Sequence, residues 1–301
     1  MSGDDRYFEV TGARLRYRVA GAGPAVVLIH GWTLDLDMWE PQVGALSNRL
    51  RVVRFDRRGF GLSSGIPGIA EDVADVRELC RHLGVTRAAF VGMSQGARVL
   101  ERLIAVEADL VASVVFDGAP DLTPGGQLTS NDMPVAEYAA LARSEGLEAF
   151  RRKWTAHPAA QLVTTDSQMR DLLNRMIARY PGRDLGVVPG RDATVGAFRA
   201  GSEATPAALT AGASAATPAE PTTGASAAAE APADLSSIRV PVLIINGAQD
   251  LESHLAAGDL LVQRIPGAQR AVIAGAGHLP NLDNSAAYNQ ILQRFFFELA
   301  P

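Results

Sequence analysis

Two segments of the chain carry the pattern Gly-x-Ser-x-Gly, whose serine can act as a nucleophile when it stands on a sharp turn between a strand and a helix. Residues 92–96 meet this condition, because they follow the apolar run 87–91 and lead into the helical pattern 97–104. Residues 61–65 are followed by proline and glycine, which predict a loop. We therefore take Ser94 as the candidate nucleophile. The alternative is an ordinary helix start, capped by a serine.

A serine hydroxyl is a weak nucleophile at neutral pH and needs a base beside it, held in turn by a third group. His278 is the best candidate base among the five histidines, because it lies in the glycine-rich segment 275–280, directly after the last expected strand. The glycines would let this loop bend towards Ser94. The alternative, a histidine in a surface loop, leaves those glycines unexplained.

Two aspartates could orient this histidine, and both follow expected strands. Asp250 comes after the apolar run 240–246, and the chain order of serine, aspartate and histidine is then the one typical of a strand-turn-helix nucleophile. Asp117 ends the run 112–116 and could reach the same imidazole from the neighbouring strand. We favour Asp250 and keep Asp117 as the alternative acid.

Acyl transfer also builds negative charge on an oxygen atom, which needs backbone donors placed in advance. One N–H group is that of Gln95, directly after the nucleophile and at the positive end of the expected helix. The second would come from Trp32, in the turn His30-Gly31-Trp32 that follows an apolar strand. The indole of Trp32 could line the pocket or pack in the core.

The elements that must position these residues alternate between strand and helix. Strands are expected at 14–20, 25–29, 51–55, 88–91, 112–116, 240–246 and 270–274, and helices at 39–47, 69–83, 95–106, 255–263 and 285–299. Short apolar strands that alternate with helices predict an α/β fold, with a mostly parallel sheet covered on both faces by helices.

Between the fifth and sixth of these apolar strands the pattern changes to helices alone, at 134–143, 147–154 and 167–180. We expect a helical insert before the last two strands. Its apolar side chains either line a substrate pocket or pack the insert onto the sheet. The candidate pocket residues are Trp154, Met169, Leu173 and Met176.

Composition limits the remaining choices. The chain has 301 residues, a net charge of −5 and a single cysteine, Cys80. No basic stripe suggests nucleic acid, no apolar run has membrane-spanning length, and the N-terminus lacks the apolar segment of a signal peptide. We expect a cytoplasmic protein that acts on a small molecule.

Five motifs in order resemble the α/β-hydrolase superfamily. They are His30-Gly31-Trp32, Asp56-Arg57-Arg58-Gly59-Phe60-Gly61-Leu62-Ser63, Gly92–Gly96, Gly247-Ala248-Gln249-Asp250 and Gly275-Ala276-Gly277-His278. The second motif resembles a structural loop of that superfamily, which explains the second Gly-x-Ser-x-Gly segment. Within the superfamily the chain is similar to enol-lactonases, carboxylesterases, C–C hydrolases and cofactor-free haloperoxidases. Haloalkane dehalogenases and epoxide hydrolases are disfavoured, because they use an aspartate where this chain has Ser94.

The resemblance implies a core domain of residues 1–120 and 236–301 and a helical cap of residues 121–190. Residues 191–235 are rich in Ala, Thr, Pro and Gly and are expected to form a flexible linker.

The leading hypothesis is a serine hydrolase of a small ester or lactone, working without cofactor or metal. The alternatives are a C–C hydrolase or perhydrolase with the same triad and, less favoured, a ligand-binding receptor. The substrate and the oligomeric state cannot be read from the sequence.

Overall fold

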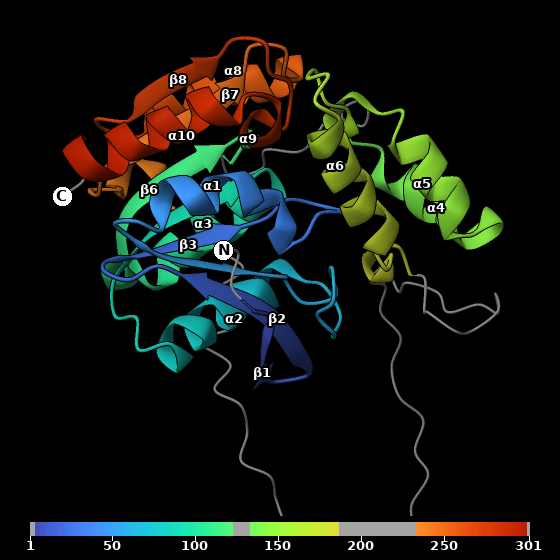
Figure 1. The fold of residues 1–301 in the computed structure, drawn as a ribbon, viewed down its shortest axis with the longest axis horizontal. Helices are drawn as coiled ribbons and strands as arrows, with labels where there is room; N and C mark the ends of the chain where they lie inside the picture. Colours follow the sequence, from blue (N-terminus) through green and yellow to red (C-terminus); the bar gives the residue numbers. More distant parts are fainter. Residues whose placement is uncertain (1–3, 123–132, 187–232, 300–301) are drawn as a thin grey trace, which may run out of the picture.

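The computed structural model of the protein describes residues 4–122, 133–186 and 233–299. They build one eight-stranded sheet with the order β1-β2-β4-β3-β5-β6-β7-β8 (Figure 1). The strands are β1 (Arg6–Val10), β2 (Ala13–Ala20), β3 (Ala25–Ile29), β4 (Arg51–Phe55), β5 (Ala88–Met93), β6 (Val111–Asp117), β7 (Val242–Gly247) and β8 (Gln269–Ile273). From β4 to β8 all neighbouring pairs are parallel, whereas β2 pairs antiparallel with both β1 and β4. The expected mostly parallel α/β fold is confirmed.

Strand β3 shows how the sheet divides the core. All five of its residues are buried. Successive side chains of a strand point to opposite faces, so Val26 and Leu28 join one apolar cluster whereas Val27 and Ile29 join the other. A strand that is buried on both faces reads as a continuous apolar run, which is why the sequence predicts it well.

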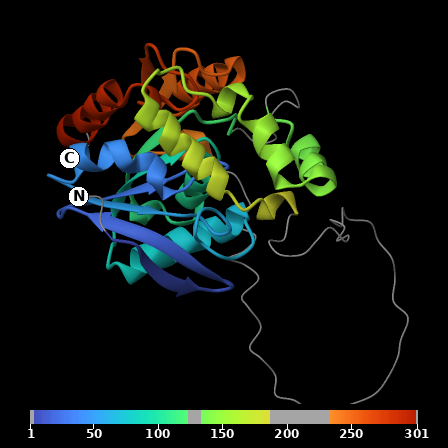
Figure 2. The same ribbon diagram turned by 45° about the vertical axis from the view of Figure 1, so that its right-hand side comes forward.

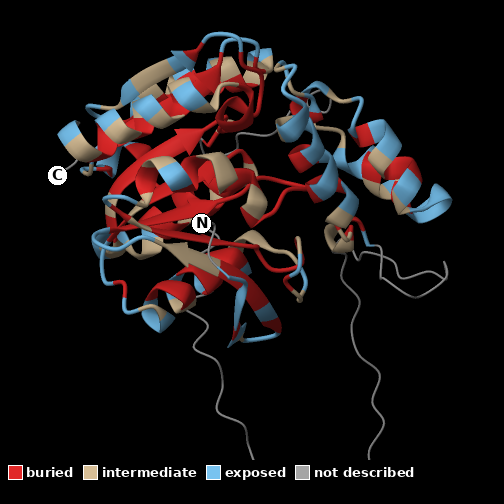
Figure 3. Cartoon of the chain, viewed as in Figure 1, coloured by how far each residue is buried: buried red, intermediate tan, exposed pale blue. Residues whose placement is uncertain are grey.

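Helices cover both faces of the sheet. The first cluster includes side chains of α1 (Glu40–Leu46) and α10 (Ser285–Arg294), and the second those of α2 (Ile69–His82), α3 (Gln95–Val106) and α8 (Glu252–Arg264). Figure 3 shows their inner sides buried and their outer sides exposed. The other short helical elements of the core domain are η1 (Leu36–Trp39), η2 (Ala108–Leu110), η5 (Leu235–Ser237), α9 (Pro280–Asp283) and the π-helical η6 (Phe295–Leu299). Across the described ranges no helix is both long and apolar enough to cross a bilayer.

Strand β1 is the element that the sequence does not predict. It lies at the edge of the sheet, and of its five residues only Phe8 is buried. A short edge strand with charged, exposed side chains lacks the apolar run on which strand prediction depends.

The expected insert lies between β6 and β7 and consists of α4 (Val135–Glu145), α5 (Leu147–Trp154), η3 (Pro158–Ala160), α6 (Ser167–Arg179) and η4 (Arg183–Leu185). Figures 1 and 2 show it, in green and yellow, as a cap beside one end of the sheet. Residues 123–132 and 187–232, which hold parts of the expected cap and most of the expected linker, lie outside the described residues. After them, Ala233 and Leu235 are buried against the core, and the Ala233 N–H donates to the Glu101 carboxylate.

Candidate active site

Ser94 stands on a sharp turn at the end of β5, directly before α3. Its backbone is in a conformation unusual for a residue with a side chain, with φ +51° and ψ −112°. The turn is possible because its neighbours have no side chain: a Cβ on Gly92 would lie 2.5 Å from the Gly96 carbonyl oxygen, and a Cβ on Gly96 would lie 2.4 Å from the Ile29 carbonyl oxygen. This is the strand-turn-helix arrangement expected from the sequence.

His278 and Asp250 form a hydrogen-bonded pair. The imidazole Nδ1 lies 2.8 Å from Oδ1 of Asp250, which follows the end of β7. The same carboxylate accepts hydrogen bonds from the Leu251 N–H and the Asn246 amide, both at 2.8 Å. With a charged carboxylate at Nδ1, that nitrogen carries the proton and Nε2 is left to accept one.

Burial and charge set the protonation of this pair. Burial by itself would raise the pKa of Asp250, but the attraction of His278 and the hydrogen bonds to the carboxylate outweigh it and hold that pKa at about 2. Burial would lower the pKa of His278, and the Asp250 carboxylate raises it above its usual 6.5. The pair is therefore a carboxylate beside a more basic imidazole.

Asp117, the alternative acid, has a different environment. Its carboxyl group accepts a hydrogen bond from the Tyr288 hydroxyl at 2.9 Å, and its Oδ1 is buried without a hydrogen-bond partner. Complete burial raises its pKa to about 8. Its backbone carbonyl accepts the Ser94 N–H at 2.8 Å. Asp117 therefore supports the turn at Ser94 through its backbone, whereas Asp250 is the carboxylate bonded to His278.

The turn that carries Trp32 lies against the turn at Ser94. A Cβ on Gly31 would approach the Met93 sulfur to 2.6 Å, the Met93 carbonyl oxygen to 3.3 Å and the Ser94 Cβ to 3.4 Å, so the two turns are in close contact. On the other side, α3 begins at Gln95, whose side chain accepts a hydrogen bond from Arg57 at 2.8 Å. The two expected oxyanion donors thus belong to turns that flank Ser94.

A narrow, mainly apolar cavity opens onto Ser94 and His278, with a free volume of about 10 Å³, which is room for about one water molecule. Its other lining residues are Trp32, Thr33, Leu34, Met93, Met133, Trp154, Ala159, Ala160, Leu173, Ile177 and Leu279. Of the four pocket residues suggested by the sequence, Trp154 and Leu173 line this cavity. Met176 is buried in the core cluster, and Met169 packs against that cluster. Ile177, which is not among those four, also lines the cavity and lies one turn after Leu173 on α6, so it belongs to the same helical apolar pattern.

The second Gly-x-Ser-x-Gly segment has a structural role. The Ser63 hydroxyl donates to the Asp56 carbonyl at 2.8 Å and accepts the Arg16 N–H at 2.9 Å. Ser63 is buried, so these bonds close its own loop onto strand β2.

Among the described residues, one group of metal-ligating side chains is close enough to share an ion. It consists of Asp250, His254 and His278, whose candidate ligand atoms lie within 4.8 Å of one another. The ring of His254 lies 4.6 Å from that of His278. Because Asp250 and His278 already bond each other, this group is explained by the hydrogen-bonded pair and a neighbouring ring.

Comparisons with known proteins identify the family to which this fold belongs. 3-Oxoadipate enol-lactonase 1 of Acinetobacter baylyi is 27% identical over 282 residues, 90% of this chain and 88% of the relative. A protein of Synechocystis sp., provisionally named a non-heme chloroperoxidase, is 29% identical over 293 residues, 93% of each chain. The structure of a thermophilic esterase from Thermogutta terrifontis has the same fold, with a TM-score of 0.74 at 21% identity, and the match covers 98% of this chain and 100% of that one.

The family of the α/β hydrolase fold matches residues 24–285, which include the whole sheet from β3 onward, the cap and the cavity between them. The chain therefore belongs to the α/β-hydrolase family of enzymes.

Proposed function

We propose that this protein is a serine hydrolase that cleaves a small carboxylic ester or lactone through an acyl-enzyme on Ser94. The observation that carries the proposal is the combination of a strained serine turn with the 2.8 Å contact between His278 and Asp250, at one cavity. The likeness to an enol-lactonase supports a lactone or ester as the substrate. Asp250 is the acid of this triad, and Asp117 is not.

In acylation, Nε2 of His278 takes the proton from the Ser94 hydroxyl while the oxygen attacks the substrate carbonyl. The negative charge moves to the carbonyl oxygen, where the N–H groups of Trp32 and Gln95 stabilise it. The tetrahedral intermediate then collapses, and the leaving alkoxide takes the proton from His278. Asp250 stays ionised and stabilises the imidazolium, as its low pKa requires.

In deacylation, a water molecule takes the place of the alcohol. His278 removes one proton from this water as it attacks the acyl group on Ser94, and then returns the proton to the serine oxygen. The products are a carboxylic acid and free Ser94. For a lactone, acid and alcohol remain parts of one molecule.

The test compares Ser94→Ala with the wild-type protein on p-nitrophenyl acetate and butyrate. The variant should lose about 10³-fold or more in kcat/KM, because the covalent route disappears. Ser63→Ala is the matched control, because it removes the serine of the other Gly-x-Ser-x-Gly segment, and it should stay within about threefold per folded molecule. Equal rates for wild type and Ser94→Ala would exclude Ser94 as the nucleophile.

A second candidate reaction on the same residues is perhydrolysis or C–C bond hydrolysis. The relative that bears a chloroperoxidase name favours perhydrolysis. Peracetic acid formation from acetate and hydrogen peroxide, with negligible ester turnover, would favour that reaction, and turnover of a vinylogous ketone would favour C–C hydrolysis. Tight binding of a small molecule, together with failure of a fluorophosphonate probe to label Ser94, would favour a receptor on the same scaffold.

Cys80 is buried, and burial raises its pKa to about 12, so the thiol is protonated at neutral pH and does not compete with Ser94 as a nucleophile.

We place this activity in the cytoplasm. A single buried cysteine suits a reducing compartment. Labelling of a tagged protein in fractionated cells tests this location.

A further inference from the structure

The turn between β3 and η1, residues 31–35, is held from outside by the cap. The Trp32 indole N–H donates to the Asp184 carboxylate at 2.5 Å, and the Trp154 indole N–H donates to the Thr33 hydroxyl at 2.8 Å. Arg179, at the end of α6, donates to the Asp35 carboxylate with N–O distances of 3.0 and 2.7 Å. Three residues of one short turn are therefore each bonded to a different part of the cap.

Thr33 explains why this turn needs support. Its φ is +62°, in the left-handed region that a β-branched residue rarely occupies. Such a conformation persists only where its surroundings enforce it. The contacts that enforce it here include the bond from Trp154 to its own hydroxyl and the bonds of its neighbours to Asp184 and Arg179.

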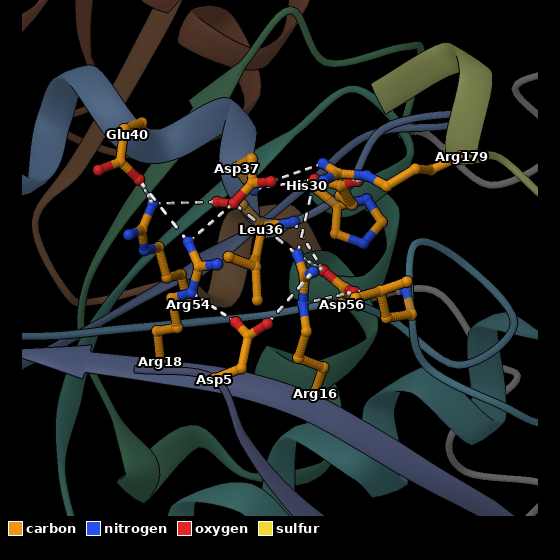
Figure 4. A network of polar contacts seen from close by, with 12 residues as sticks. Asp5, Arg16, Arg18, His30, Leu36, Asp37, Glu40, Arg54, Asp56 and Arg179 are labelled. Carbon is orange, nitrogen blue, oxygen red and sulfur yellow. Dashed lines mark hydrogen bonds and ion pairs between the residues drawn. The ribbon is translucent and has the colours of Figure 1, made fainter. Parts of the chain in front are cut away.

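Charge strengthens the connection at Arg179. Figure 4 shows this guanidinium entering, from the cap side, a network of ion pairs of which some members are buried. The network joins the carboxylates of Asp5, Asp35, Asp37, Glu40 and Asp56 with the guanidinium groups of Arg16, Arg18, Arg54 and Arg179. Asp35 is 1% exposed, so withdrawal of Arg179 would leave a buried carboxylate with less positive charge around it.

The cap also reaches the loop of the catalytic histidine. One oxygen of the Asp283 carboxylate accepts the N–H groups of Val163 and Thr164, in the cap, at 2.6 and 2.9 Å. The other oxygen accepts the N–H of Gly277, the residue before His278, at 2.7 Å. A single buried carboxylate thus connects the cap backbone to the histidine loop.

We propose that the docked cap is a working part of the catalytic machinery, because its polar contacts position both the oxyanion turn and the histidine loop. Arg179, Asp184, Trp154 and Asp283 are the positioning residues of this device, and none of them has to touch the reacting atoms. This inference rests on the proposed function. It predicts that loosening these contacts reduces turnover and not only substrate binding, since a small displacement of the donors weakens stabilisation of the transition state.

The experiment compares Arg179→Gln with Arg175→Gln, which makes the same change one turn earlier on α6 at an exposed position. Steady-state kinetics on p-nitrophenyl butyrate should show kcat reduced about tenfold or more in Arg179→Gln, with KM within about threefold. The affinity for phenylboronic acid, whose serine adduct resembles the tetrahedral intermediate, should fall in parallel with kcat/KM. Arg175→Gln should match the wild type, and Arg179→Lys should recover part of the loss.

Two further variants keep the test decisive if Arg179→Gln does not fold. Thr33→Val removes the hydroxyl that accepts the Trp154 N–H with little change of shape, and Asp283→Asn weakens the link to Gly277; both should lower kcat and boronate affinity. If KM alone changes, or if kcat is unchanged in all three, the cap only binds substrate and the inference is wrong. A wild-type protein without Ser94-dependent ester hydrolysis would instead overturn the proposed function, and this inference with it.

Discussion

Two turns meet beside the cavity, and both hold a non-glycine residue at positive φ: Ser94 at +51° and Thr33 at +62°. The turn at Ser94 is enforced locally, by glycines two residues on either side. The turn at Thr33 is enforced from a distance, since Trp32, Thr33 and Asp35 bond to residues 152, 121 and 144 positions away. The proposed nucleophile is therefore held by the core, whereas the proposed oxyanion donor next to it depends on the cap.

The largest effect should come from a change that leaves both turns in place and removes the carboxylate bonded to His278. Asp250→Asn deprives His278 of its carboxylate, and we expect kcat/KM to fall by roughly 10³–10⁴ at neutral pH because the imidazolium loses its partner and Nδ1 its fixed proton. This loss sets the scale against which changes in either turn are judged.

The pH profile of the same variant gives a second readout. His278 must be neutral to accept the serine proton, so the wild-type kcat/KM should fall as the pH drops through a pKa that Asp250 raises above 6.5. Without the carboxylate this pKa decreases, and the acid limb of the remaining activity should move to lower pH. An unmoved acid limb would contradict the assignment of Asp250.

The next largest effect is expected at the locally enforced turn. In Gly96→Ala the new Cβ would lie 2.4 Å from the Ile29 carbonyl oxygen and 2.9 Å from that of His30, both backbone atoms. We expect a loss of about 1–3 kcal/mol in the free energy of unfolding and a roughly 100-fold lower kcat/KM, because the serine shifts relative to His278.

Gly44→Ala is the matched control for this prediction, because its Cβ would meet no atom within 4 Å inside α1. It should gain about 0.5–1 kcal/mol in unfolding free energy by urea denaturation, with unchanged activity. A Gly96→Ala protein as active as Gly44→Ala would show that the turn at Ser94 tolerates displacement.

The difference between the turns also explains what the sequence predicts. The turn at Ser94 can be predicted from the sequence, because the glycines that permit it lie close to it in the chain. Asp250 and His278 are readable as candidates because each follows a strand of a parallel sheet, and such strands end at one edge. The hydrogen-bond partners of Thr33 and Trp32 cannot be predicted from the sequence, since they depend on how the cap folds back over the sheet.

In the cap, too, the sequence predicts the elements but not their contacts. The helical spacing of residues 167–180 predicts α6 to within one residue. Spacing alone does not say which apolar residue faces the cavity: Leu173 does, whereas Met176 packs into the core. The charges of Asp184 and Arg179 give no sign in the sequence that they bond to a turn near the N-terminus.

A smaller effect is expected at the turn that the cap enforces. Thr33→Val keeps the branched shape but removes the hydroxyl that accepts the Trp154 N–H, and leaves that buried donor without its partner. We expect kcat/KM to decrease about tenfold, with a loss of about 1–3 kcal/mol in unfolding free energy. Thr33→Ser retains the hydroxyl and should stay within about threefold of the wild type. If the two variants behave alike, the bond to Trp154 does not hold the turn.

The smallest effect on activity should come from Asp117→Asn, which keeps the backbone carbonyl that accepts the Ser94 N–H. We expect kcat/KM within about threefold of the wild type, because the carboxyl is not the partner of His278 and can be replaced by a neutral amide. A loss as large as that of Asp250→Asn would make Asp117 the acid of the triad.

Stability should respond more than activity to this change. Burial raises the Asp117 pKa from 3.8 to about 8, so the folded protein retains a proton that the unfolded chain releases. The resulting penalty is absent below about pH 4, grows as the pH rises and is complete above about pH 8, where it reaches roughly 2–5 kcal/mol. Asparagine has no proton to release, so it does not carry this penalty. The unfolding free energy of Asp117→Asn minus that of the wild type, measured by urea denaturation, should therefore be larger at pH 8 than at pH 4. If the unfolding free energies of the two proteins depend on pH in the same way, Asp117 is already ionised in the folded protein. That is the state expected of a carboxylate that pairs with His278.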